Sequence, residues 1–126
     1  AELIGSDGMV AAREEVELAV EALAAAGLGA ISVDFTLPDL IDTLAASALP
    51  LPPDRIDAVR RELDMKDAGG LVAAGGEAYL PLLYAAGPIE AAIERLTAID
   101  EAGVLQSRIA AIREIARALD GKARLT

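Results

Sequence analysis

Glycine and proline residues cut this 126-residue sequence into short segments, and they limit the length of any regular element it can form. Gly27 follows the first long apolar pattern, and three prolines lie within residues 49–53. A Gly-Gly pair at 75–76 and a Gly-Pro pair at 87–88 come next. Both residue types disfavour helix interiors and commonly mark helix ends. The sequence therefore predicts a series of short helices after a longer first one.

Between these breaks, apolar residues mostly recur at helical intervals. Val16, Val20 and Leu23, for example, fall on one face of a helix. Alanine, which is abundant here, also has the highest intrinsic helix propensity. We predict helices over residues 9–26, 38–46, 54–65, 66–74, 77–86, 88–99 and 104–119.

Residues 30–36 follow a different pattern, in which apolar and polar side chains alternate. This alternation, with β-branched and aromatic residues, predicts a strand near Ile31. Short extended segments near Ala1 and Leu125 indicate two further strands. The sequence thus predicts a helix-rich α/β (α+β) fold in which a block of helices is inserted between strands. The proline-rich residues 49–53 are the best candidate for an internal boundary.

The residue types that are absent exclude several classes of function. There is no histidine and no cysteine, so the chain lacks the commonest general base, the commonest transition-metal ligands and any thiol nucleophile. The net charge of -10 opposes binding to nucleic-acid phosphates and to anionic membranes. We therefore expect no catalysis, no cofactor, no metal and no nucleic-acid partner for this chain.

One weakly charged stretch, residues 68–89, has the length of a membrane span. Glu77 lies near its middle, and several glycines and prolines break it. Two short buried helices therefore explain it better than a span does. The first residues also lack the basic region and apolar run of a secretory signal. We expect a cytoplasmic protein that does not enter the membrane.

Residues 70–75 have the glycine spacing of a phosphate-binding loop. That loop needs a lysine and then a serine or threonine directly after the second glycine. Gly76 and Glu77 occupy those places, and a carboxylate there would repel phosphate. We predict that these glycines mark helix ends.

Two groups of carboxylates are candidate cation sites. Asp34, Asp39 and Asp42 cluster around the predicted second strand and the helix after it, and three carboxylates could bind Mg²⁺ or Ca²⁺. Asp64 and Asp67 lie between two helices. Helix capping and a solvated acidic surface are the simpler interpretation of both groups.

Other charged residues fit helical surfaces. Arg13 and Glu17 have the i,i+4 spacing of an ion pair, and Arg113 and Arg117 suit the last turns of a helix. The uncharged residues 80–84 are too apolar for a short exposed helix. They form either internal core or a protein-contact surface.

Three short strings and the order of the predicted elements resemble the histidyl-tRNA synthetase-like family, and the resemblance covers essentially the whole chain. The strings are residues 2–7 (Glu-Leu-Ile-Gly-Ser-Asp), residues 31–38 (Ile-Ser-Val-Asp-Phe-Thr-Leu-Pro) and residues 63–71 (Leu-Asp-Met-Lys-Asp-Ala-Gly-Gly-Leu). Within that family, the chain is most similar to the non-catalytic regulatory subunits of ATP phosphoribosyltransferase. We expect it to be an internal fragment of such a protein.

This resemblance implies a fold and a function. The fold is the class II synthetase antiparallel sheet with a helical insertion; residues 1–44 and 104–126 belong to the core, and residues 45–103 to the insertion. The function is to support the first step of histidine biosynthesis and its feedback by histidine. The implied partners are a catalytic ATP phosphoribosyltransferase subunit, further copies of the protein and histidine itself. Glu2 matches the glutamate that contacts the histidine ammonium in the synthetase.

Two alternatives stay open at this stage. The chain could come from a true histidine–tRNA ligase, although Thr36-Leu37-Pro38 and the acidic charge favour the regulatory subunit. It could also be a helical protein-interaction module with no synthetase ancestry.

Overall fold

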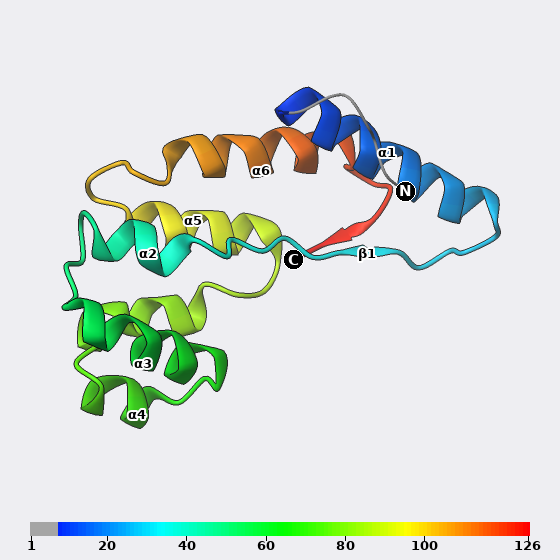
Figure 1. Ribbon diagram of the computed structural model, residues 1–126. Coiled ribbons are helices and arrows are strands. Elements are labelled where there is room, and N and C mark those ends of the chain that lie inside the picture. Colours follow the sequence, from blue (N-terminus) through cyan, green and yellow to red (C-terminus); the bar gives the residue numbers. More distant parts are fainter. Residues whose placement is uncertain (1–7) are drawn as a thin grey trace. The chain divides into compact units, whose positions relative to one another are not determined.

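The computed structural model describes residues 8–126 (Figure 1). Its elements in chain order are α1 (Met9–Ala25), β1 (Ser32–Val33), α2 (Leu40–Ala45), α3 (Pro53–Asp64), α4 (Ala68–Ala73), the 3-10 helix η1 (Glu77–Tyr84), α5 (Ile89–Ile99), α6 (Gln106–Ala118) and β2 (Arg124–Leu125). The chain folds into two compact units. We call Ala1–Phe35 with Arg108–Thr126 the terminal unit, and Thr36–Ser107 the central unit.

The helix ends follow the local signals in the sequence. Pro53 occupies the first turn of α3, where its missing N–H costs nothing. The Asp67 carboxylate caps α4 by accepting a hydrogen bond from the Gly70 N–H at 2.9 Å. Gly75 follows α4 at a φ of 84°, a conformation that suits glycine. The predicted helices therefore form, most of them slightly shorter than predicted.

The predicted helix over residues 77–86 is the one whose type differs. It forms as the 3-10 helix η1, with Pro81 inside it. Proline has no N–H to donate and crowds the preceding turn, so a regular α-helix is disfavoured here.

The terminal unit is built around a small sheet. β1 pairs with β2 in parallel, with Ser32 opposite Arg124 and Val33 opposite Leu125. A buried cluster of Val20, Ile115 and Leu119 lies beside this sheet, and the partly buried residues packed against the cluster are Met9, Val16, Ile31, Val33, Phe35, Ala123 and Leu125. Side chains of α1 and of the end of α6 pack against the sheet. This packing is needed because two short strands alone are only marginally stable in water.

This pairing differs from the expected antiparallel sheet, which is not confirmed. The two described strands run parallel, and each is only two residues long. Strand direction depends on how distant segments meet, and neither local sequence pattern fixes that. The third predicted strand, near Ala1, lies outside the described residues.

The central unit consists of short helices that pack on their neighbours. α2 packs on α3, α3 on α4, α4 on η1 and η1 on α5. The side chains it buries completely are those of Leu44, Val59, Leu71, Tyr79, Ile93 and Leu105. The unit boundaries fall at 35/36 and 107/108. The predicted division at 44/45 and 103/104, between a synthetase-like core and an insertion, stays a prediction.

A membrane crossing would need a long, apolar helix. Within residues 8–126 no helix has both the length and the apolar character to span a bilayer. The weakly charged stretch is divided between α4, η1 and the start of α5.

Candidate functional site

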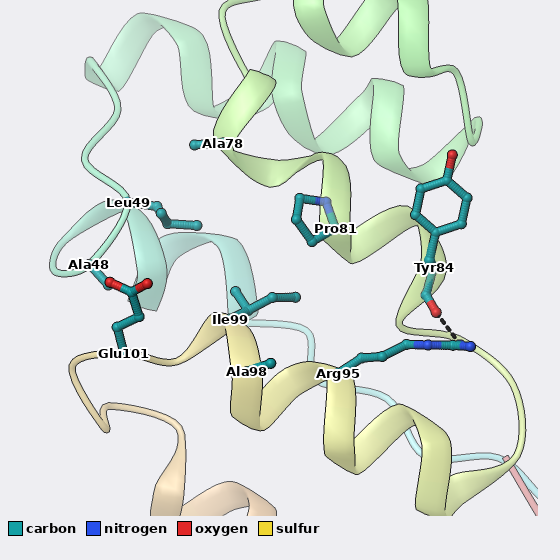
Figure 2. Close-up of a pocket in the computed structure, with 9 residues that line it drawn as sticks. All are labelled: Ala48, Leu49, Ala78, Pro81, Tyr84, Arg95, Ala98, Ile99 and Glu101. Atoms are coloured by element: carbon teal, nitrogen blue, oxygen red, sulfur yellow. Dashed lines mark hydrogen bonds between the residues drawn. The ribbon is translucent and has the colours of Figure 1, made fainter.

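The central unit has an open pocket of about 480 Å³ between η1, α5 and the segment after α2 (Figure 2). We call it the η1–α5 pocket. Leu49, Pro81 and Ile99 supply much of its apolar lining. Tyr84 stands at its edge with 66% of its surface exposed. The pocket thus presents an apolar floor directly to solvent.

A buried tyrosine fixes one wall of this pocket. Tyr79 is 1% exposed, and its hydroxyl donates a hydrogen bond to the Leu49 carbonyl at 2.6 Å. Burial raises the pKa of Tyr79 above its usual value of 10.0, because the phenolate would lose its hydration. The hydroxyl therefore stays protonated and holds the segment after α2 against η1.

An arginine fixes the opposite wall. Arg95, on α5, donates from Nη1 to the Tyr84 carbonyl and to the Ala86 carbonyl, the latter at 3.4 Å. These carbonyls lie at the end of η1 and just beyond it, so Arg95 ties the end of η1 to α5. Its long side chain also forms part of the pocket lining.

The pocket carries opposite charges at its two ends. Figure 2 shows Glu101 at one end and Arg95 at the other, with Leu49, Pro81 and Ile99 between them. Neither charged side chain forms an ion pair with any other residue of the described part of the chain. This arrangement suits binding of an amphipathic group. It offers no nucleophile beside a general base.

A second pocket of about 490 Å³ lies in the central unit beside α2, α3 and the end of η1. Arg60 lines it and bonds to two carboxylates, to Asp42 at 2.8 Å and to Asp57 at 2.9 Å. The guanidinium is thus already neutralised by its own chain. Asp64 and Lys66 also line this pocket, and neither forms an ion pair within residues 8–126.

The predicted carboxylate clusters do not assemble into a cation site. Asp42 pairs with Arg60, and Asp67 caps α4. Asp34, in the terminal unit, accepts a hydrogen bond from the Thr126 hydroxyl. Residues 8–126 contain no group of three or more potential ligands placed to hold a metal ion. Asp67 thus serves a helix end and Asp42 a surface ion pair, in line with the simpler interpretation.

The glycines of the loop-like motif have packing roles. Gly76 follows α4, and a Cβ there would lie 2.6 Å from Leu71 Cδ1 and 2.9 Å from Val59 Cγ2. Gly75 and Gly76 lie just after α4, as predicted, whereas Gly70 lies inside it. No phosphate-binding loop is formed.

The predicted ion pair on α1 is present. Arg13 Nε lies 3.2 Å from Glu17 Oε1, and Arg13 Nη1 also lies 3.3 Å from Glu114 Oε1 on α6. Arg117 lies in the last turn of α6, as helix-dipole complementarity predicts. Arg113 lies earlier in the helix.

The apolar stretch 80–84 is divided between two environments. Leu82 and Leu83 are half-buried and line the second pocket, whereas Pro81 and Tyr84 are exposed at the η1–α5 pocket. None of residues 80–84 is fully buried, so the stretch is not internal core, and a protein contact there stays a prediction.

Glu2, the predicted histidine-ammonium ligand, lies outside the described residues. Sequence patterns also missed Asp100, a residue that is 8% exposed and whose carboxylate accepts hydrogen bonds from the N–H groups of Val104 and Leu105, both at 2.8 Å. The available sequence signal was an aspartate placed shortly before Gly103 and the predicted last helix, where a carboxylate can accept hydrogen bonds from free backbone N–H groups.

Comparison with known proteins gives a consistent set of relatives. The family model described as histidyl-tRNA synthetase matches residues 1–126. The ATP phosphoribosyltransferase regulatory subunit of Rhodospirillum centenum is 38% identical over 102 residues, which are 79% of this chain and 26% of that protein. The proteins of the same name from Rhodospirillum rubrum and Paramagnetospirillum magneticum are 38% and 37% identical, over 92% and 93% of this chain and 31% and 32% of their own lengths. The chain thus spans less than a third of these curated relatives. No solved structure matches it.

Proposed function

The chain belongs to the histidyl-tRNA synthetase family, and from that premise we propose that it is part of a regulatory subunit of ATP phosphoribosyltransferase. The observation that carries this proposal is the shared name of four curated relatives, which are 34–38% identical over at least 79% of the chain. The sequence-based prediction of the family is confirmed. The alternative of a helical module without synthetase ancestry is wrong.

In this function the whole protein binds a catalytic subunit that joins ATP to phosphoribosyl pyrophosphate. It supports that first step of histidine biosynthesis in the cytoplasm and transmits inhibition by histidine. The composition supports a non-catalytic role, because the chain has neither histidine nor cysteine. Its net charge of -10 also opposes tRNA binding by this segment.

We further propose that β1 and β2 belong to a larger, class II synthetase-like sheet in the whole protein, with antiparallel strands beyond this pair. Residues 45–103 are its helical insertion. The continuous central unit, which lies between two segments of the terminal unit in the sequence, supports this proposal. Glu2 is proposed to bind the histidine ammonium, since a carboxylate is a natural partner for that group.

A histidine–tRNA ligase is the second candidate, because the matching family model carries that description. Thr36-Leu37-Pro38 and the acidic balance favour the regulatory subunit. Transfer of histidine to tRNA by the protein alone would decide for the ligase.

Reconstitution tests the proposal. The full-length protein that contains this chain is mixed with a catalytic ATP phosphoribosyltransferase subunit, and phosphoribosyl transfer is assayed with and without histidine. We expect faster transfer than by the catalytic subunit alone, and inhibition by histidine only in the mixture. No change in transfer would overturn the regulatory assignment.

The role of Glu2 has its own test in the same assay. Glu2→Gln removes the negative charge with little change in shape, so we expect weaker inhibition by histidine with unchanged stimulation. Asp7→Asn, a nearby carboxylate, is the matched control. Equal inhibition constants for the two variants would contradict the assignment of Glu2.

A further inference from the structure

The η1–α5 pocket holds an arginine that is fixed in place but has no carboxylate partner. Arg95 donates to the carbonyls of Tyr84 and Ala86, and it forms no ion pair within residues 8–126. Its guanidinium lies at one end of an apolar floor (Figure 2). We propose that this pocket binds a small amphipathic monocarboxylate, a molecule with one carboxylate on an apolar body. The proposal goes beyond the proposed function and does not depend on it.

The guanidinium of Arg95 keeps the donors that a carboxylate needs. It has five N–H groups in a planar fork, and within residues 8–126 the Tyr84 and Ala86 carbonyls engage Nη1 alone. Nε and Nη2 therefore remain to donate to the two oxygens of one carboxylate, a geometry for which arginine is suited. Because the backbone carbonyls already hold the side chain, less conformational freedom is lost when a ligand binds.

The surface beside the guanidinium suits an apolar ligand body. Leu49 and Ile99 are half-buried, and Pro81 is exposed beside them. Tyr84 adds an exposed aromatic ring at the edge. A ligand that covers these side chains removes apolar surface from water, which stabilises the complex. The pocket volume of about 480 Å³ lies within the usual range for small-molecule sites, about 300–1,000 Å³.

Glu101 restricts what the far end of the ligand can carry. Its exposed carboxylate lies at the opposite end of the floor from Arg95 (Figure 2). A second carboxylate on the ligand would meet a like charge there, whereas a neutral or cationic end would not. The net charge of -10 further opposes ligands with several negative charges, such as nucleotides. The pocket should therefore select a monocarboxylate over a dicarboxylate of the same length.

The second pocket of the central unit is less suited to the same ligand. Its arginine, Arg60, is already bonded to the carboxylates of Asp42 and Asp57. The other two charged residues that line it, Asp64 and Lys66, have opposite signs, so a carboxylate there would meet repulsion as well as attraction. The two pockets have nearly equal volumes, which makes the second an internal comparison for the first.

Titration with two eight-carbon acids tests the proposal. Octanoate carries one carboxylate, and suberate carries one at each end of a chain of the same length. Nitrogen–proton correlation spectra of the full chain report binding residue by residue. We expect octanoate to shift the signals of Ala98 and Ile99, which line the pocket, with a dissociation constant of about 5 mM or lower, in line with the binding efficiency of small ligands. Suberate should bind more weakly.

Variants at both ends of the pocket assign the two charges. Arg95→Gln removes the carboxylate partner and should weaken octanoate binding about fivefold or more. Glu101→Gln removes the repulsion, so it should improve the affinity for suberate relative to octanoate about threefold or more. Glu90→Gln, at an exposed position on α5 outside the pocket, is the matched control for Glu101→Gln and should leave this ratio unchanged.

A further variant keeps the test decisive if Arg95→Gln loosens the end of η1. Ala98 is exposed in the pocket, so Ala98→Glu breaks no buried contact and places a carboxylate beside the ligand site. It should weaken octanoate binding about fivefold or more. Ala73→Glu, the same change at an exposed position on α4, is the matched control. Circular dichroism checks that each variant is folded.

Any one of four results would overturn the proposal. The first is the lack of a saturable shift at Ala98 and Ile99 with octanoate up to about 20 mM, several times the expected dissociation constant. The second is an equal loss of octanoate binding in Ala98→Glu and Ala73→Glu. The third is an unchanged ratio of suberate to octanoate affinity in Glu101→Gln. The fourth is larger shifts around the second pocket than around the η1–α5 pocket.

Discussion

The contacts inside the central unit differ in kind from the contacts inside the terminal unit. The central unit is one continuous stretch in which each helix packs on a neighbour close in sequence. The terminal unit joins two segments that are far apart, through the pairing of β1 with β2 and the contact of Arg13 on α1 with Glu114 on α6. Local contacts close small loops, whereas distant ones must first overcome a larger entropy of loop closure.

The two units also differ in how many large apolar side chains they bury. Of the seven large side chains that are fully buried within residues 8–126, six belong to the central unit and one, Leu119, to the terminal unit. Within residues 8–126, four exposed large apolar side chains lie in or near α1 of the terminal unit (Val10, Leu18, Leu23 and Leu28), and three lie in the larger central unit (Met65, Val72 and Tyr84). The comparison indicates a central unit that carries its own core and a terminal unit that depends more on a few contacts.

The largest effects should come from emptying each core. Leu44→Ala in the central unit and Leu119→Ala in the terminal unit remove side chains that are both 0% exposed. Each should lower the free energy of unfolding by about 2–5 kcal/mol, through lost burial and a residual cavity. Chemical denaturation measures the loss, and hydrogen exchange locates it.

The residues whose hydrogen exchange speeds up in each variant test whether the two units are stabilised separately. Leu44→Ala should speed exchange mainly within residues 36–107, and Leu119→Ala mainly in residues 8–35 and 108–126. If either variant loosens both segments equally, the two units unfold as one and the distinction is wrong.

A smaller effect is expected from the hydroxyl of Tyr79. Tyr79→Phe removes its hydrogen bond to the Leu49 carbonyl and should cost about 1 kcal/mol at neutral pH. Burial raises the pKa of Tyr79 in the folded state above 10.0, so the folded state binds this proton more tightly than the unfolded state does. The contribution is complete below pH 10 and falls as pH rises through the folded-state pKa.

The difference in stability between wild type and Tyr79→Phe should therefore shrink above pH 10. Urea denaturation at several pH values measures it. Tyr84→Phe, at an exposed side chain, is the matched control and should change stability little at any pH. A constant difference for Tyr79→Phe across this range would contradict the burial argument.

The smallest effect concerns the ion pairs of the terminal unit. Arg13→Ala removes the contacts with Glu17 and Glu114, which are partly exposed, so we expect a loss of about 0.2–1 kcal/mol that fades at high salt. Arg55→Ala, at an exposed position on α3, is the control. A loss above 2 kcal/mol that salt does not reduce would show that packing of the arginine stem matters more than its charge.

Local structure was largely predictable from the sequence. The first helix, predicted over residues 9–26, is Met9–Ala25, and α5 and α6 also begin and end close to their predicted bounds. Apolar periodicity and the glycine and proline breaks are local signals, so they fix helices well. The strand near Ile31 was also found, although only Ser32 and Val33 are paired as a strand.

Long-range structure was not predictable in the same way. The parallel direction of β1 and β2 depends on how two distant segments meet, and no local pattern encodes it. The η1–α5 pocket was missed for the same reason, because Arg95 and Glu101 become the two ends of one surface only when η1 packs on α5. Neither residue stands out in the sequence, since charged residues on helical surfaces are common.

The pairing of β1 with β2 also sets an order of events during synthesis. A ribosome delivers Ser32 and Val33 long before Arg124 and Leu125, so β1 must wait for its partner while the whole central unit emerges. During that interval the continuous central unit can complete its own packing, but the terminal unit cannot. The nascent chain should thus become protease-resistant first within residues 36–107, and a pause in translation before residue 124 would leave the strand exposed to the quality-control machinery of the cell.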